Sequence, residues 1–181
     1  QNCGAGNGIV IQGGSSPSIQ YNTITNNYFH GIVVPYNSGG NMPLIHGNTI
    51  TYNGPTNYVG IIVDNCPVEV SSNTVHHSAG GIYSVNYGYI RSTDFASYYD
   101  QGNNIVTNTN LALLADGNSY MYMGTTAGSE VIYFYGACNH IYNNGYNAVS
   151  NYGGYLIAQG NWWGSASPDP AKFSTYQGTL D

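Results

Sequence analysis

Asp64 and Asp116 are the residues best placed in this sequence to act as a pair of catalytic carboxylates. Asp64 follows the apolar run GIIV and Asp116 follows the run ALLA, so the two acids occupy equivalent positions in their segments. Glycoside hydrolysis uses two carboxyl groups held about 5 to 9.5 Å apart. Aspartate is also a common turn residue at the end of a strand, and the ordinary interpretation of both acids is structural.

The histidines and cysteines do not show the spacing of a metal site. His76 and His77 are adjacent, and adjacent strand residues face opposite sides of a sheet, so we expect that the two rings cannot share one site without a bulge. No Cys/His cluster has zinc spacing. The sequence therefore predicts no metal and no cofactor. The remaining histidines, His30, His46 and His140, are expected to be ordinary surface residues. The three cysteines, Cys3, Cys66 and Cys138, are expected to be buried thiols.

Tyrosine is the most distinctive side chain, with 19 copies in 181 residues. The segments SYMYMG and VIYFYG alternate tyrosine with Met, Ile or Phe, as strands with one apolar face do. Tyr120 and Tyr122 then share one face, as do Tyr133 and Tyr135. Rows of tyrosine could stack on sugar rings or pack against another protein. They could equally stabilise the outer face of a sheet.

An asparagine followed by a short β-prone run recurs along the chain and indicates the elements that position these residues. The triplets Asn-Thr-Ile, Asn-Thr-Val, Asn-Ile-Val, Asn-His-Ile and Asn-Trp-Trp are degenerate copies of one pattern at intervals of 22 to 35 residues. Internal repeats of this length are typical of solenoids. The recurring asparagines are Asn22, Asn48, Asn73, Asn104, Asn139 and Asn161.

Each repeat contains about three short strands. Runs such as GIVI, GIVV and GIIV precede runs such as SIQ, LIH and VEV, and the asparagine triplets follow, with Gly, Ser, Pro and Asn between them. A unit of this size cannot bury its apolar side alone, but stacked units can pair strand on strand about 4.8 Å apart. The sequence predicts an all-β fold, a single-stranded parallel β-helix of about six coils.

The asparagines have a structural role in this fold. Asparagine tolerates left-handed backbone angles at a sharp turn, and stacked side-chain amides can hydrogen-bond from coil to coil. We therefore expect a ladder of the six asparagines at one corner of the solenoid. The apolar residues beside them should point inward: Ile24, Ile50, Val75, Val106 and Ile141.

The recurring GIxV … N-T-I-x-x-N pattern, closed by GNWWG and then SPDPAKF, resembles the right-handed parallel β-helix repeat proteins of the pectate-lyase-like solenoid group. The resemblance covers roughly residues 7–165, and the Asn-Trp-Trp-Gly ending is similar to the last coil of bacterial surface and secreted members. It implies an extracellular location. It does not imply one function, because this solenoid hosts lyases, hydrolases, epimerases, adhesins and passenger domains.

Polyuronate lyases of that group typically use an Arg or Lys as base and acidic ligands that hold calcium. Here Arg91, Asp94 and Asp100 lie together in YIRSTDFASYYD, which interrupts the repeat. Calcium is expected only under this enzymatic interpretation. The alternative is a surface ion pair between Arg91 and Asp94, which contributes little energy.

The charge composition excludes two classes of partner. Only 6% of residues are charged, and Arg91 and Lys172 are the two basic ones. Nucleic-acid binding needs clustered Lys and Arg, so it is not expected. Membrane attachment through basic residues is not expected for the same reason, and no apolar run approaches the roughly 20 residues of a spanning helix.

We expect residues 1–165 to form the β-helix, as a segment of a longer chain with neighbouring domains, and residues 166–181 to leave the stack. One of Trp162 and Trp163 should cover the interior of the last coil. The predicted role is an extracellular, secreted or cell-surface, non-catalytic module, a spacer or adhesin-like segment, with polysaccharide or other surface proteins as partners. The alternative is a polysaccharide lyase or glycoside hydrolase.

Overall fold

The computed structural model describes residues 6–36, 42–51, 53, 57–92, 104–107, 109–124 and 138–181. Within these residues the protein consists of nineteen short β-strands and one 3-10 helix, η1 (Pro170–Lys172). All strand pairs are parallel, and the strands form three sheets. The prediction of an all-β, parallel architecture is confirmed.

Sheet A has seven strands, in the order β1 (Ile9–Val10), β4 (Ile32–Val34), β7 (Val59–Asp64), β10 (Gly80–Val85), β13 (Leu111–Ala115), β16 (Tyr146–Asn151) and β18 (Phe173–Tyr176). Sheet B also has seven: β2 (Ser18–Gln20), β5 (Leu44–His46), β8 (Pro67–Ser71), β11 (Tyr89–Arg91), β14 (Tyr120–Tyr122), β17 (Tyr155–Ile157) and β19 (Thr179–Leu180). Sheet C has five: β3 (Thr23–Thr25), β6 (Thr49–Thr51), β9 (Thr74–His76), β12 (Ile105–Thr107) and β15 (His140–Tyr142).

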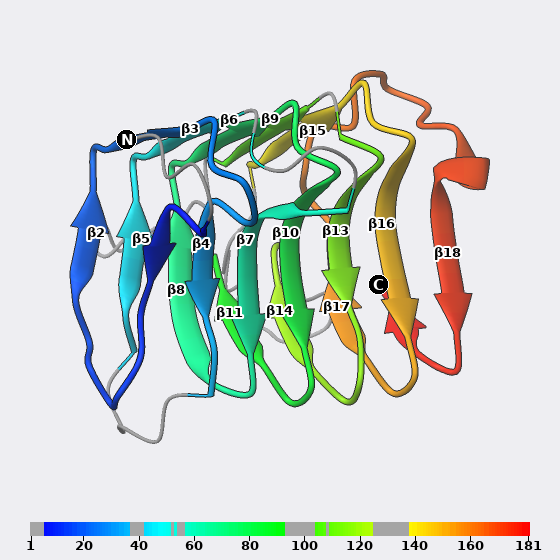
Figure 1. Ribbon diagram of the computed structural model, residues 1–181. Helices are drawn as coiled ribbons and strands as arrows, with labels where there is room; N and C mark the ends of the chain where they lie inside the picture. The colour runs from blue at the N-terminus through cyan, green and yellow to red at the C-terminus, as the bar shows by residue number, and fades with distance from the viewer. Residues whose placement is uncertain are drawn as a thin grey trace.

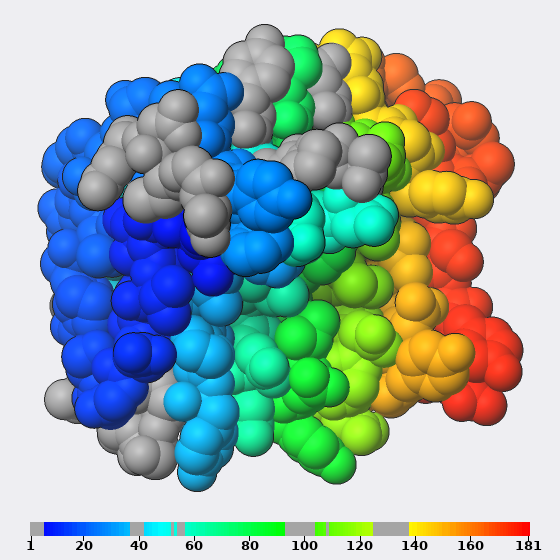
Figure 2. All heavy atoms as spheres, viewed as in Figure 1, coloured from blue at the N-terminus to red at the C-terminus, as the bar shows by residue number. Residues whose placement is uncertain are grey.

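Up to β17 the chain visits the sheets in the fixed order A, B, C, so that each strand from β1 to β14 pairs with the strand three positions later (Figure 1). Among the described residues after β17, sheet C is represented only by the bridge of Trp162 to His140, and β18 returns to sheet A. We call one such circuit a coil; coil 1 is β1–β3 and coil 5 is β13–β15. The coils advance from one end of the molecule to the other, which appears in Figure 2 as successive bands of colour. This topology is compatible with a parallel β-helix.

The core lies between the three sheets and is built from every second residue of each strand. The residues predicted to point inward from sheet C are all buried: Ile24, Ile50, Val75, Val106 and Ile141. They pack with buried residues of the other sheets into one cluster, which includes Ile61 of β7 and Val70 of β8. The alternation of the strands therefore sets one apolar interior.

In the first five strands of sheet A, a small residue precedes the apolar part because the neighbouring corner leaves no room for a side chain. A Cβ on Gly31 would lie 2.5 Å from Cγ2 of Ile50 and 2.6 Å from the carbonyl oxygen of Gly60. A Cβ on Gly60 would meet Val75 in the same way. The inward β-branched residues of sheet C thus dictate the glycines of the GIxV runs.

The last sixteen residues differ from the prediction. Residues 166–181 were expected to leave the stack, but β18 pairs with β16 and β19 pairs with β17, so they add most of a further coil. The prolines do not prevent this. Pro168 lies in the connection before η1 and Pro170 opens η1, where a missing N–H costs nothing, and the β pattern resumes at Phe173.

The two tryptophans behave as expected at this end. Trp163 packs against the core and contacts the ring of Phe173 edge-on, with 4.9 Å between the ring centroids. Trp162 is 46% exposed and forms a β-bridge with His140 of β15. An open, mainly apolar cavity of 240 Å³ lies beside Trp163 and is bordered by Phe173 and Leu180. One tryptophan therefore covers the interior and the other faces outward.

Candidate functional site

The predicted asparagine ladder is present and continuous over six coils. In each step the backbone N–H and the side-chain Nδ2 of one asparagine both donate to Oδ1 of the asparagine in the next coil, at 2.9 to 3.2 Å. Nδ2 of Asn48 also lies 2.8 Å from the carbonyl oxygen of Ile19 in the preceding coil. One amide therefore links three coils. The ladder residues are Asn22, Asn48, Asn73, Asn104, Asn139 and Asn161.

The reason given for asparagine at these positions was wrong in one respect. Among the described residues, the left-handed backbone angle falls on the residue before the ladder asparagine. Tyr21 has φ of 54°, Ser72 of 56° and Cys138 of 64°, whereas none of the ladder asparagines has positive φ. The left-handed residue turns the chain, and the next residue then directs its amide into the stack. Asparagine is required for its side-chain hydrogen bonds, not for its backbone tolerance.

A second, shorter ladder runs five residues after the first and was not predicted as a ladder. Nδ2 of Asn27 donates to Oδ1 of Asn53 at 2.7 Å, and Oδ1 of Asn144 accepts from the backbone and hydroxyl of Thr109 at 3.0 and 2.9 Å. Ser78 occupies this position in coil 3, and its hydroxyl is buried without a partner. The final Asn of the N-T-I-x-x-N pattern carried the signal. Both ladders serve the scaffold.

The feature that extends beyond the scaffold is a cluster of four tyrosines on the outer face of sheet B, which we call the tyrosine face: Tyr89, Tyr120, Tyr122 and Tyr155. Tyr120 pairs in register with Tyr89 and with Tyr155, so three consecutive coils contribute. The ring centroids of Tyr122 lie 5.5 Å from Tyr89 and 6.3 Å from Tyr155. Tyr120 is 47% exposed.

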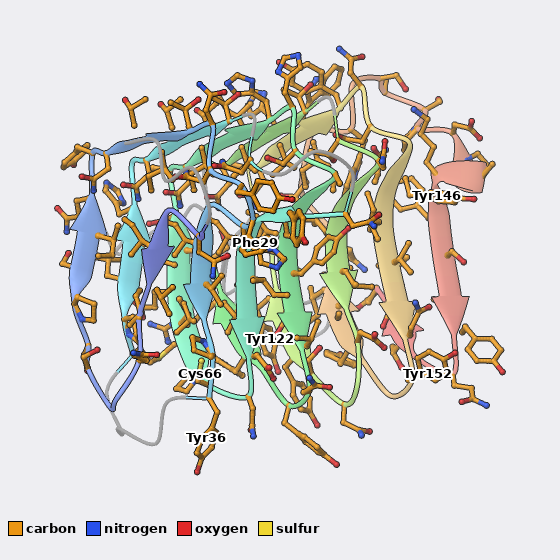
Figure 3. All side chains as sticks on the ribbon, viewed as in Figure 1. Phe29, Tyr36, Cys66, Tyr122, Tyr146 and Tyr152 are labelled. Carbon is orange, nitrogen blue, oxygen red and sulfur yellow. The ribbon has the colours of Figure 1, made fainter. Side chains whose placement is uncertain are left out.

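The predicted alternation in this strand is confirmed. Tyr120 and Tyr122 lie on the outer face of β14, and Met121 between them is fully buried. Burial and, secondarily, the neighbouring tyrosines raise the pKa of Tyr122, which Figure 3 labels on β14. The phenol of Tyr122 therefore stays neutral at physiological pH and remains a hydrogen-bond donor beside an apolar ring face.

Arg91 adjoins the tyrosine face and is paired with an acid that sequence reasoning missed. Arg91 pairs in register with Tyr122 on one side and with Glu69 on the other. Its Nη2 lies 3.0 Å from Oε1 of Glu69, whose side chain is 3% exposed. The sequence run VEV could have indicated this pair. Its two valines point inward and so direct Glu69 outward, and the alignment of Val68 with Ile90 places Glu69 beside Arg91.

The two predicted carboxylates, Asp64 and Asp116, lie in one column of the stack but in different coils. Asp64 is in register with Val85, and Asp116 follows Ala115, the partner of Ser84, so one coil lies between the acids. Oδ1 of Asp64 accepts from Nδ2 of Asn86 at 3.1 Å. Oδ1 of Asp116 is buried with no hydrogen-bond partner. Each acid therefore belongs to its own turn between sheets A and B.

The expectation that His76 and His77 face opposite sides is wrong. Their Nδ1 atoms lie 2.6 Å apart, because His77 has φ of 53° and no longer follows the strand alternation. The cysteine expectation is right for Cys66, which is buried, and wrong for Cys138, which is exposed, while Cys3 lies outside the described residues.

Four of the predicted site residues lie outside the described residues: Asp94, Asp100, Tyr133 and Tyr135. In the described part of the chain no group of three or more His, Cys, Asp or Glu side chains could hold a metal ion. The same residues contain no helix long and apolar enough to cross a membrane.

Comparison with known proteins gives no relative: no family model, no curated protein and no solved structure matches this chain. Function is therefore argued from the residues alone.

Proposed function

We propose that this chain is a right-handed parallel β-helix module of the pectate-lyase-like solenoid group that binds polysaccharide through the tyrosine face of sheet B. It acts outside the cell, on a secreted or surface protein of bacterial type, as a non-catalytic segment among neighbouring domains. Three parallel sheets visited in fixed order support the fold assignment.

The observation that carries the proposal is the grouping of Tyr89, Tyr120, Tyr122 and Tyr155 on one outer surface. The C–H groups of a sugar ring pack on an aromatic face, while phenolic hydroxyls bond its hydroxyls. Consecutive coils repeat the platform along the stack, as an extended polymer requires. Arg91, whose side chain is 32% exposed, borders it as a hydrogen-bond donor, whereas the carboxylate of Glu69 is buried.

The proposal is tested by affinity electrophoresis in gels that contain neutral or uronate polysaccharides. Tyr120→Ala should weaken retardation about tenfold or more, because it removes the most accessible ring of the tyrosine face. Tyr146→Ala is the matched control: Tyr146 is 50% exposed but starts β16 in sheet A (Figure 3). Equal losses in both variants, or no retardation in any gel, would overturn the proposal.

The runner-up function, a lyase or glycoside hydrolase near Arg91, Asp94 and Asp100, is less well supported by the described geometry. The guanidinium of Arg91 is engaged with Glu69, so it is not a free base. Turnover of pectate or alginate by the wild type, abolished in Arg91→Ala, would favour the enzyme and displace the binding proposal.

A further inference from the structure

The imidazole rings of His76 and His77 face each other at the end of β9, on sheet C and away from the tyrosine face. Their Nδ1 atoms are 2.6 Å apart and their ring centroids 4.9 Å apart. Two ring nitrogens at this distance cannot both present bare lone pairs to each other. A proton or a cation must lie between them.

Two threonines are the neighbours of His76 in the adjacent coils. Thr51 and Thr107 are the register partners of His76 in β6 and β12. Oγ1 of Thr51 lies 3.1 Å from Nδ1 of His76. Oγ1 of Thr107 is buried and has no hydrogen-bond partner, and the residue is only 9% exposed. A buried hydroxyl without a partner is uncommon and points to a missing ligand or water.

A neutral imidazole has one N–H and one bare nitrogen, so either a hydrogen bond between the rings or a shared cation satisfies this geometry. Metal binding requires neutral imidazole, and each ring offers a bare Nδ1 when its proton lies on Nε2. The chain has a formal charge of −6, which also favours cations.

We propose that His76 and His77 form a binding site for a divalent transition-metal ion, with both Nδ1 atoms as ligands. Imidazole suits Zn²⁺, Ni²⁺ and Cu²⁺, and Cu²⁺ binds most tightly. Metal–nitrogen bonds of about 2.0–2.1 Å need the two nitrogens about 2.9 Å apart or more. A small rotation of the two rings, which moves the nitrogens apart by a few tenths of an ångström, provides this separation. The Thr51 hydroxyl and waters occupy the remaining positions.

The test is a titration with Zn²⁺, followed in long-range proton–nitrogen NMR spectra of the histidine rings. One ion per chain should shift Nδ1, not Nε2, of both His76 and His77. His77→Asn should weaken Zn²⁺ binding at least about tenfold in calorimetry. Asparagine keeps the fold here, because Asn26 and Asn143 adopt the same left-handed angle at the equivalent turn of coils 1 and 5.

His140→Asn is the matched control, because His140 lies exposed on the same sheet but outside the pair. It should bind Zn²⁺ as the wild type does. The proposal fails if wild type shows no binding at millimolar Zn²⁺, if Nε2 shifts instead, or if His77→Asn and His140→Asn lose affinity equally. If His77→Asn lowers the melting temperature, its loss of affinity could come from unfolding. The nitrogen shifts of the wild type alone then decide whether both histidines bind Zn²⁺ through Nδ1.

Discussion

Oδ1 of Asn73 accepts two hydrogen bonds from Asn48 of the preceding coil, one from the backbone N–H and one from Nδ2, both at 3.0 Å. Both residues are fully buried. Each asparagine inside the stack is thus a donor to one neighbour and an acceptor for the other, and no single amide can be removed without leaving partners unsatisfied.

Replacing Asn48 by leucine should lower the free energy of unfolding by about 1–3 kcal/mol, because both Asn22 and Asn73 lose a buried partner. Urea denaturation measures the change. Asn22→Leu is the matched control, since Asn22 is exposed at the first coil and should cost clearly less. Equal losses at the two positions would mean that the ladder does not stabilise the interior coils.

Gly31→Ala should destabilise the protein by about 1–3 kcal/mol through overpacking, because its Cβ would clash with Ile50 and with the backbone of Gly60. Gly6→Ala is the control: its Cβ would meet nothing within 4 Å, and Gly6 does not have positive φ. Thermal unfolding of both variants checks this. An unchanged melting temperature in Gly31→Ala would show that the corner between sheets C and A accommodates the added methyl group.

Arg91→Met should cost about 1–3 kcal/mol at pH 7, because it leaves the buried carboxylate of Glu69 without its cation. The double variant Arg91→Met, Glu69→Gln should recover part of the loss, since the carboxylate is then absent. A double-mutant cycle in urea gives the coupling. Additive losses would show that the two side chains are not energetically coupled.

The protein should become less stable as the pH falls below about 6.5, and His30 should contribute. Burial lowers the pKa of His30, so the native state disfavours the proton that the unfolded chain takes up. The stability that neutral His30 contributes is therefore fully present above the pKa of the unfolded state. It is lost as the pH falls through the pKa of the folded state. Unfolding at pH 5.5 and 7.5 should show a smaller difference in His30→Gln. An unchanged difference would exclude this role.

Most of the scaffold was readable from the sequence because it repeats. The asparagine column and the inward position of Ile50 or Val106 follow from a pattern that recurs in each coil. Prediction from sequence spacing failed where one residue departs from the regular alternation of its strand or where the repeat pattern is interrupted. The left-handed angle of His77 brings its ring to that of His76, and the strand after Pro170 resumes sheet A.

The candidate site was only partly predictable. Alternation within one strand placed Tyr120 and Tyr122 on a common face, but contact with Tyr89 and Tyr155 depends on register between coils. Repeat lengths vary, so the register of distant tyrosines could not be read off by counting. Glu69 was overlooked for the same reason, since its partner Arg91 lies one coil away.

The side-chain amides of the ladder all point the same way along the stack, since Nδ2 always donates toward the C-terminal neighbour. Their dipoles add and polarise one another, instead of cancelling. The ladder therefore has a net dipole along the stack, with its amide oxygens toward the first coil. Two copies placed end to end could continue the hydrogen-bond chain only head to tail, because a head-to-head contact would bring oxygen against oxygen.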